Sequence, residues 1–339
     1  MTTRTARQIQ LVRRPAGLPT TDDFRMVDVD LPDLGPDQVR VRNTVLSVDP
    51  YMRGRMNDTE SYAEPYALEA PMLGAAVGVV EESTSDRVPV GATVSHGAAW
   101  RDAEVLDAGA VRVVDVERAP ASAYLGVLGM PGLTAYVGLR RIAALAEGET
   151  VFVSGAAGAV GSAVGQFARQ LGAARVIGSA GSPEKVAWLT EELGFDAAFD
   201  YHDGKVSHLL RDALDRTGGG RADVYFDNVG GEHLEAALLH LAEFGRVAAC
   251  GAITTYNDQQ PAPGPRTIGL VVPRKLTIRG FIVSDHADLA GDFYASAPGW
   301  VADGSVRTRE TYFEGLEQTV DAFLGLFSGA NLGKMLVRL

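Results

Sequence analysis

The chain contains a single cysteine, Cys250, among its 339 residues. One thiol cannot form an internal disulfide, and it cannot supply the several thiolates of a cysteine-based structural zinc site. The opening residues MTTRTARQIQLVRRP lack the apolar core of a signal peptide, and no apolar run reaches the length of a transmembrane helix. These absences predict a cytoplasmic protein that makes no contact with a membrane.

Basic residues are in the minority. The sequence carries 31 Lys and Arg against 43 Asp and Glu, which gives a net charge of −12. Such a balance disfavours nucleic acid as the main partner, although it leaves room for a local basic pocket. A chain of this length is also too long for one ordinary hydrophobic core, so we expect two domains.

Histidine is scarce too, and its spacing matches no metal-binding motif such as HExxH. The six histidines are His96, His202, His208, His233, His240 and His286. Together with the lone cysteine, this pattern predicts that the protein holds no catalytic metal. The zinc route for interconverting alcohols and ketones is therefore disfavoured.

The first part of the chain is rich in short β-like runs separated by turn residues. The clearest runs are 39–49, 77–82, 92–100 and 111–116. Strands spaced this closely predict a small barrel or sandwich. The pattern changes at MPGLTAYVGLRRIAAL (130–145), where Pro131 is placed to open a helix.

Beyond that point, expected strands and helices alternate. The strands are predicted over 150–155, 175–180, 196–201, 222–230, 246–251 and 276–283. Ser182 and Pro183 form a typical helix start after the second of them. Regular alternation predicts a parallel sheet covered on both faces, which is an α/β architecture. The long aperiodic segment 253–269 is predicted to be a functional loop. The segment KMLVRL near the end is predicted to be a strand.

Three glycines follow the first strand of this alternating region, in FVSGAAGAVGS. Gly155, Gly158 and Gly161 have the spacing G-x-x-G-x-x-G rather than the stricter G-x-G-x-x-G. One interpretation is a dinucleotide site, in which backbone amides and the positive end of a helix meet a pyrophosphate. The other is a helix start that merely packs tightly. The strand before and the helix after favour the dinucleotide.

The next strand indicates which dinucleotide is bound. Proteins that read a ribose 2′-hydroxyl usually end this strand with Asp or Glu, whereas here it ends in GSAGS (178–182). Lys185 follows within a turn and could meet a 2′-phosphate, although beside Glu184 it could also belong to a solvated helix face. The missing acid favours NADP(H) over NAD(H).

Several separated segments resemble one known family. They are VDPYMRGRM (48–56), GMPGLTAY (129–136), GAAGAVGS (155–162), GSPEK (181–185), FDNVGG (226–231), CGAITTYN (250–257) and NLGK (331–334). Together they resemble the zinc-independent prostaglandin reductase / leukotriene B4 dehydrogenase branch of the medium-chain dehydrogenases/reductases, closest to the bacterial curcumin-reductase-like members. Zinc-dependent relatives typically carry Gly-His-Glu where this chain has Gly74-Ala75-Ala76.

The resemblance implies a Rossmann-type doubly wound domain over 127–306 and a GroES-like β-barrel catalytic domain over 1–126 and 307–339. It implies NADPH-dependent reduction of a C=C bond conjugated to a carbonyl, in a homodimer that pairs through LTIRGFIV (276–283). The family's cofactor contacts carry over to Gly158, Ala159, Val160, Gly161, Lys185, Tyr201, Asn228, Cys250, Gly251, Ala252, Tyr256, Phe281, Val283 and Asn331.

Reduction of an enone places negative charge on the carbonyl oxygen, and without a metal that oxygen needs a hydrogen-bond donor. A tyrosine suits because it stays protonated near neutral pH. Tyr256 is the first candidate and Tyr51 the second, with the cofactor ribose hydroxyl as an alternative. Tyr62 and Tyr66 could form an aromatic wall for a planar substrate.

Other functions remain open on the same scaffold. Quinone reduction and allylic-alcohol oxidation need the same cofactor and no zinc. A catalytically inactive nucleotide-binding subunit would keep the glycine motif but not the chemistry.

Overall fold

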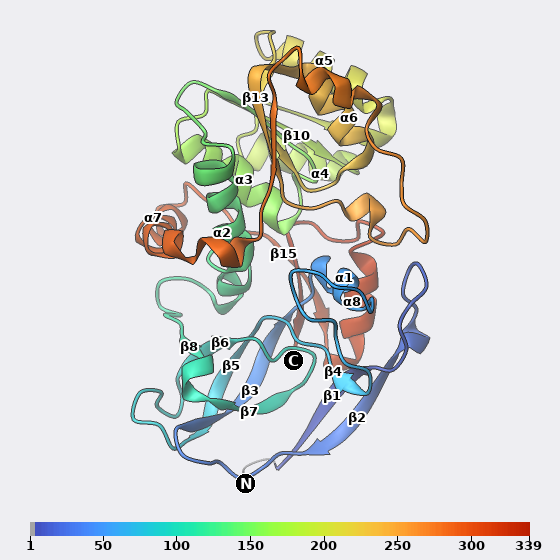
Figure 1. The fold of residues 1–339 in the computed structure, drawn as a ribbon. Helices are drawn as coiled ribbons and strands as arrows, with labels where there is room; N and C mark the ends of the chain where they lie inside the picture. Colours follow the sequence, from blue (N-terminus) through green and yellow to red (C-terminus); the bar gives the residue numbers. More distant parts are fainter. Residues whose placement is uncertain (1–3) are drawn as a thin grey trace. The chain divides into compact units, whose positions relative to one another are not determined.

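The computed structural model describes residues 4–339, which divide into two compact units (Figure 1). The first unit runs to Leu125 and resumes over Glu310–Leu339, and the second covers Gly126–Arg309. Residues 1–3, which the predicted first domain includes, lie outside the described residues. No helix in residues 4–339 is both long enough and apolar enough to cross a membrane.

The first unit holds a three-stranded sheet in the order β2-β1-β4 and a seven-stranded sheet in the order β15-β16-β3-β5-β6-β8, with β7 paired to β3. Its strands are β1 (Thr5–Leu11), β2 (Phe24–Asp30), β3 (Gln38–Ser47), β4 (Ala70–Pro71), β5 (Ala76–Ser83), β6 (Thr93–His96), β7 (Ala103–Asp107), β8 (Arg112–Val113), β15 (Glu310–Glu314) and β16 (Lys334–Arg338). Its helices include α1 (Tyr51–Arg55) and α8 (Thr319–Gly325). Neighbouring strands are antiparallel except β15 and β16, so the unit is a mixed β structure.

Aromatic side chains fill the core between these sheets and α8. The Trp100 ring stacks on Phe24 at 5.6 Å and meets Phe323 edge-on at 5.8 Å. A buried ion pair joins the end of the chain to this core, because Lys334 Nζ lies 2.7 Å from Asp49 Oδ1 and donates to the Val48 carbonyl at 2.9 Å. The final strand is therefore an integral part of the first unit.

The second unit is built on a six-stranded sheet in the order β11-β10-β9-β12-β13-β14. Its strands are β9 (Thr150–Val153), β10 (Arg175–Ala180), β11 (Ala197–Asp200), β12 (Ala222–Asp227), β13 (Leu241–Ala249) and β14 (Thr277–Gly280), and all neighbouring pairs are parallel. Its helices are α2 (Met130–Val137), α3 (Ala159–Gln170), α4 (Pro183–Ala187), α5 (Val206–Arg216), α6 (Gly231–His240) and α7 (Ala290–Ala302). Figure 1 shows α2 and α3 on one side of this sheet and α5 and α6 on the other. The predicted α/β fold with a parallel sheet is confirmed.

Several predicted elements differ in extent, among them β6, β8, β9 and β12, which are shorter than predicted. The strand expected over 276–283 ends at Gly280, because Phe281 leaves the sheet and packs edge-on against Phe226 at 6.3 Å. The helix expected over 130–145 changes at Gly138 into a π-helical turn (Gly138–Ile142), where any Cβ on Gly138 would lie 2.3 Å from the Phe226 ring. β13 starts five residues before the predicted 246, at Leu241.

Candidate functional site

The glycine-rich turn brings the start of α3 directly against the end of β9. Gly155 has a φ of +58°, in the left-handed region that favours glycine. A Cβ on Gly161 would lie 2.3 Å from the Gly155 carbonyl oxygen, so only glycine permits this approach. Gly158 caps α3 without a side-chain hydrogen bond, and the amides of the first turn, at Ala159, Val160 and Gly161, have no acceptor within the helix. The turn has the shape and polarity that a pyrophosphate requires.

The β10–α4 turn carries the predicted cation. The Ser182 hydroxyl accepts from the Lys185 amide at 3.3 Å, which confirms the predicted cap, and α4 begins with Pro183. The Lys185 side chain is half-buried. Burial lowers the pKa of Lys185, while the carboxylates of Glu184 and Asp200 oppose that change. No carboxylate occurs in GSAGS itself.

Tyr201 lies next to the same turn, immediately after β11 in the short helix η6 (Tyr201–Asp203). Its ring lies 4.3 Å from the His202 ring and meets the His233 ring edge-on at 5.4 Å. The structure thus gathers Lys185 and Tyr201 from two adjacent strand ends.

Asp227, at the end of β12, joins three segments of the chain. One carboxylate oxygen accepts from the Tyr225 hydroxyl (2.7 Å), the Ser154 hydroxyl (3.3 Å), and the amides of Val229 (3.0 Å) and Gly230 (2.7 Å). Its main-chain carbonyl accepts from the amides of Cys250 and Gly251 at 2.9 and 3.0 Å. Burial raises the pKa of the Asp227 carboxyl, and these donors oppose the rise.

These hydrogen bonds to Asp227, here called the Asp227 hub, hold the segments after β12 and β13 that contain further predicted cofactor residues. The Asn228 side-chain amide donates to the Ser154 carbonyl at 2.8 Å. Burial raises the pKa of the Cys250 thiol to about 12, so this cysteine is not a thiolate nucleophile at neutral pH. The sequence did not identify Ser154 or Asp227 as site residues, although an Asp beside Asn228 at a strand end is a usable signal.

Tyr256 belongs to the loop that follows β13. Its hydroxyl accepts from the Ala252 amide at 3.3 Å, and a Cβ on Gly251 would lie 2.9 Å from that hydroxyl oxygen. The loop is attached to the neighbouring turn by Thr254, whose hydroxyl donates to the Val229 carbonyl at 2.6 Å. Phe281 and Val283 come after β14, with Val283 as the first residue of η9 (Val283–Leu289).

The remaining predicted residues belong to the first unit. Tyr51 begins α1, and burial raises the pKa of its phenol above the ordinary value, with Asp49 adding to the rise. The Asn331 side chain donates to the Gly333 carbonyl at 2.8 Å. Tyr66, predicted as part of an aromatic wall, is buried, and its hydroxyl donates to the Leu73 carbonyl at 2.6 Å. Tyr62 is exposed.

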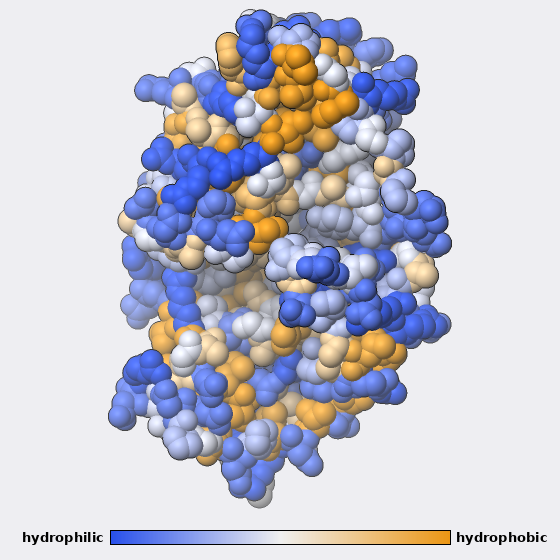
Figure 2. Space-filling view, viewed as in Figure 1, coloured by the Kyte–Doolittle hydropathy of each residue, from blue (hydrophilic) through white to orange (hydrophobic). Residues whose placement is uncertain are grey.

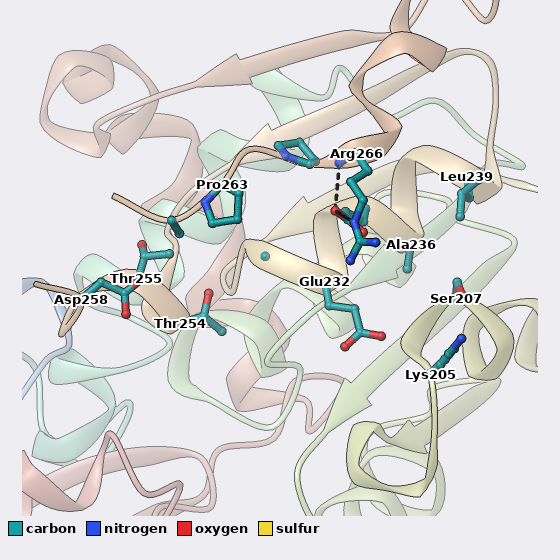
Figure 3. Close-up of a pocket in the computed structure, with 14 residues that line it drawn as sticks. Lys205, Ser207, Glu232, Ala236, Leu239, Thr254, Thr255, Asp258, Pro263 and Arg266 are labelled. Carbon is teal, nitrogen blue, oxygen red and sulfur yellow. Dashed lines mark hydrogen bonds and ion pairs between the residues drawn. The ribbon is translucent and has the colours of Figure 1, made fainter. Parts of the chain in front are cut away.

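A hollow of about 610 Å³ lies beneath the long loop after Tyr256, between that loop and α6 (Figure 3). Figure 3 shows Thr254, Thr255 and Asp258 on one side and Lys205 and Ser207 on the other. The loop is also held at its far end, where the Arg266 amide donates to the Glu235 carboxylate at 2.8 Å. Within residues 4–339, no group of three or more His, Cys, Asp or Glu side chains could hold a metal ion.

Comparison with known proteins identifies the family. Residues 7–114 match a family described as the N-terminal domain of oxidoreductase, and residues 159–296 match one described as zinc-binding dehydrogenase. A putative NADP-dependent oxidoreductase of Bacillus subtilis is 46% identical over 99% of this chain and 98% of its own length. The NADPH-dependent curcumin reductase of Escherichia coli is 37% identical over 97% of this chain and 95% of its own. The chain belongs to the prostaglandin reductase and curcumin reductase family.

Among solved structures, that of CurA from Vibrio vulnificus in complex with NADPH is similar, with a TM-score of 0.91 and 38% identity. The match covers 98% of each chain. The predicted family and the predicted two-part fold class are thereby confirmed.

The Asp227 hub predicts a graded response to substitution. Tyr225→Phe removes a hydroxyl that contacts both the Asp227 carboxylate and the Ser154 hydroxyl, and should cost about 1 to 2 kcal/mol of unfolding free energy. Asp227→Ala leaves several buried donors without an acceptor, should cost about 3 kcal/mol or more, and should weaken dinucleotide binding. Urea unfolding and equilibrium binding of the dinucleotide measure both effects.

Asp223→Ala is the matched control, because Asp223 accepts from the Thr150 amide at the opposite end of the sheet. It should lower stability by about 1 kcal/mol and leave the dissociation constant of the dinucleotide unchanged. Equal losses of binding in Asp223→Ala and Asp227→Ala would contradict a local role for Asp227.

Proposed function

We propose that this protein catalyses the NADPH-dependent reduction of the C=C bond of α,β-unsaturated ketones and aldehydes. The observation that carries this conclusion is the near full-length likeness to an NADPH-dependent curcumin reductase. The glycine turn, the half-buried Lys185 and the strand end without an acid fit NADPH on physical grounds. The predicted class, an NADP-dependent oxidoreductase, agrees with the relatives.

The residues that would hold the cofactor fall into three groups. The pyrophosphate would be bound by Gly158, Ala159, Val160 and Gly161, and the 2′-phosphate by Lys185 and Tyr201. The remainder would be lined by Asn228, Cys250, Gly251, Ala252, Tyr256, Phe281, Val283 and Asn331. When bound, NADPH supplies a hydride from its nicotinamide ring.

The protein's own task is to stabilise the enolate oxygen and to place a proton donor near the substrate. Tyr256 is the first candidate, because its hydrogen bond with the Ala252 amide fixes the orientation of the phenol. Tyr51 is the second candidate, since its raised pKa keeps the phenol protonated as a donor. A ribose hydroxyl of the cofactor is the alternative to both.

The test is oxidation of NADPH, followed by the loss of nicotinamide absorbance, with a panel of enones and enals in buffer that contains a chelator. Turnover that survives chelation is expected. A quinone, and an allylic alcohol with NADP⁺, form separate arms for the alternative activities. Tight NADPH binding without turnover of any enone or enal would overturn the proposal in favour of an inactive nucleotide-binding subunit.

Substituting each tyrosine by phenylalanine distinguishes which of them supports the enolate. Loss of one oxyanion donor typically lowers kcat by about 100- to 1,000-fold, so Tyr256→Phe should do so while the NADPH dissociation constant changes far less. Tyr51→Phe is measured in parallel, and Tyr312→Phe, which removes a hydroxyl from a ring stacked on Arg338, is the control. An unchanged kcat for Tyr256→Phe would assign that tyrosine to packing.

We also propose a homodimer that pairs through β14. This strand lies at the end of the sheet order, and all four of its residues are exposed. Exposed apolar side chains lie in the same region, among them Ile268, Val272 and Ile278. Figure 2 shows apolar surface on the upper part of this face, where Figure 1 draws the orange segment that leads into β14. An unpaired apolar edge of this kind favours pairing with a second chain.

Sedimentation should give a dimer for the natural sequence and a monomer for Ile278→Lys, which places a charge on that edge. A monomeric natural protein at assay concentration would contradict the proposal. The cytoplasmic location and the lack of a nucleic-acid partner stay predictions.

A further inference from the structure

Gly181 and Tyr201 occupy equivalent places on two paired strands. In the parallel register of β10 and β11, Ala180 lies opposite Asp200, the last residue of each strand. Gly181 and Tyr201 are therefore the first residues beyond two adjacent strand ends. Gly181 opens the turn that carries Lys185.

The tyrosine hydroxyl occupies the space that a side chain on Gly181 would need. A Cβ at this position would lie 2.6 Å from Tyr201 Oη and 2.9 Å from its Cζ. Gly181 is not among the residues with positive φ, so its backbone conformation would accept an alanine. Glycine is required at position 181 because any larger side chain would overlap the Tyr201 phenol.

Tyr201 is 37% exposed, and two imidazole rings contact its ring. His202 lies against the ring and is itself held by Asp200, whose carboxylate contacts the His202 Nδ1 at 2.9 Å and accepts from its amide at 3.0 Å. His233, on the first turn of α6, presents its ring to the tyrosine ring and is 5% exposed. The Nε2 of His233 has no hydrogen-bond partner among residues 4–339, and the imidazole ring meets the tyrosine ring edge-on as an aromatic contact.

We propose that Gly181 is a specificity-determining residue: its missing side chain admits the Tyr201 hydroxyl, beside the rings of His202 and His233, to the position where it binds the 2′-phosphate of NADPH. The inference rests on the proposed use of NADPH. Gly181 acts only through Tyr201, so it is a positioning residue.

The test uses equilibrium binding rather than turnover. NADPH and NADH are titrated separately into the purified protein, and the dissociation constants are taken from the change in fluorescence. Gly181→Ala should weaken NADPH by about tenfold or more, as expected for the loss of a hydrogen bond to a charged group, and should change NADH by less than about twofold. Lys185→Ala serves as the reference for a loss that is selective for NADPH.

Gly291→Ala is the matched control, since a Cβ at Gly291 in α7 meets no atom within 4 Å. It should change neither dissociation constant. Thermal unfolding checks that each variant is folded. An unchanged ratio of NADPH to NADH affinity in folded Gly181→Ala would overturn the proposal, as would an equal loss for both nucleotides.

A double-substitution cycle tests whether Gly181 acts through the phenol. Tyr201→Phe alone should reduce the preference for NADPH, and adding Gly181→Ala should then cost less than about twofold more, because the hydroxyl is already absent. Fully additive losses would show that Gly181 acts by another route. His233→Phe keeps an aromatic contact and should retain the preference, whereas His233→Ala should reduce it.

These outcomes can be separated from a failure of the proposed function. If the natural protein prefers NADPH but reduces no enone, the enzymatic proposal fails and the assignment of Gly181 can still be tested. If the natural protein binds NADH as tightly as NADPH, the assignment of Gly181 fails whether or not an enone is reduced.

Discussion

The interaction on which the second unit most depends is the set of hydrogen bonds to Asp227. Its carboxylate and its main-chain carbonyl together reach the end of β9, the turn before α6 and the end of β13. A charged group buried at this depth is stable only because so many donors surround it. Those donors belong to the same turns that carry the predicted cofactor residues. The carboxylate thus fixes the spacing of the binding edge without needing to touch a ligand.

Glycine residues also shape the predicted binding edge, because each leaves room for a neighbouring group. Gly161 lets α3 approach the end of β9, Gly251 leaves room for the Tyr256 hydroxyl, and Gly181 does the same for Tyr201. In each case a neighbouring polar group occupies the place of an absent Cβ. Binding surfaces in this protein are therefore shaped by the side chains that are missing as much as by those that are present.

The sequence predicted most of the second unit because its elements have simple patterns. β10 has the predicted bounds, and Ser182 and Pro183 mark the start of α4 as expected. The first unit was harder, since strands such as β2 have one exposed face and an apolar pattern interrupted by Arg25, Asp28 and Asp30. The glycine motif and Lys185 could be chosen from the local sequence, because a strand and a helix were expected on either side of the glycines and the next strand ends without an acid. The roles of Asp227 and His233 could not, because they depend on contacts between segments far apart in the chain.

The buried pair of Lys334 and Asp49 has a consequence for how the protein is made. β16 pairs with β3, so the first unit needs a strand from the last few residues of the chain to complete its larger sheet. The second unit, by contrast, is continuous in sequence and ends at Arg309. On the ribosome the second unit can fold while the first still lacks its closing strand. The larger sheet of the first unit therefore keeps an open edge at β3 until β15 and β16 have been synthesised.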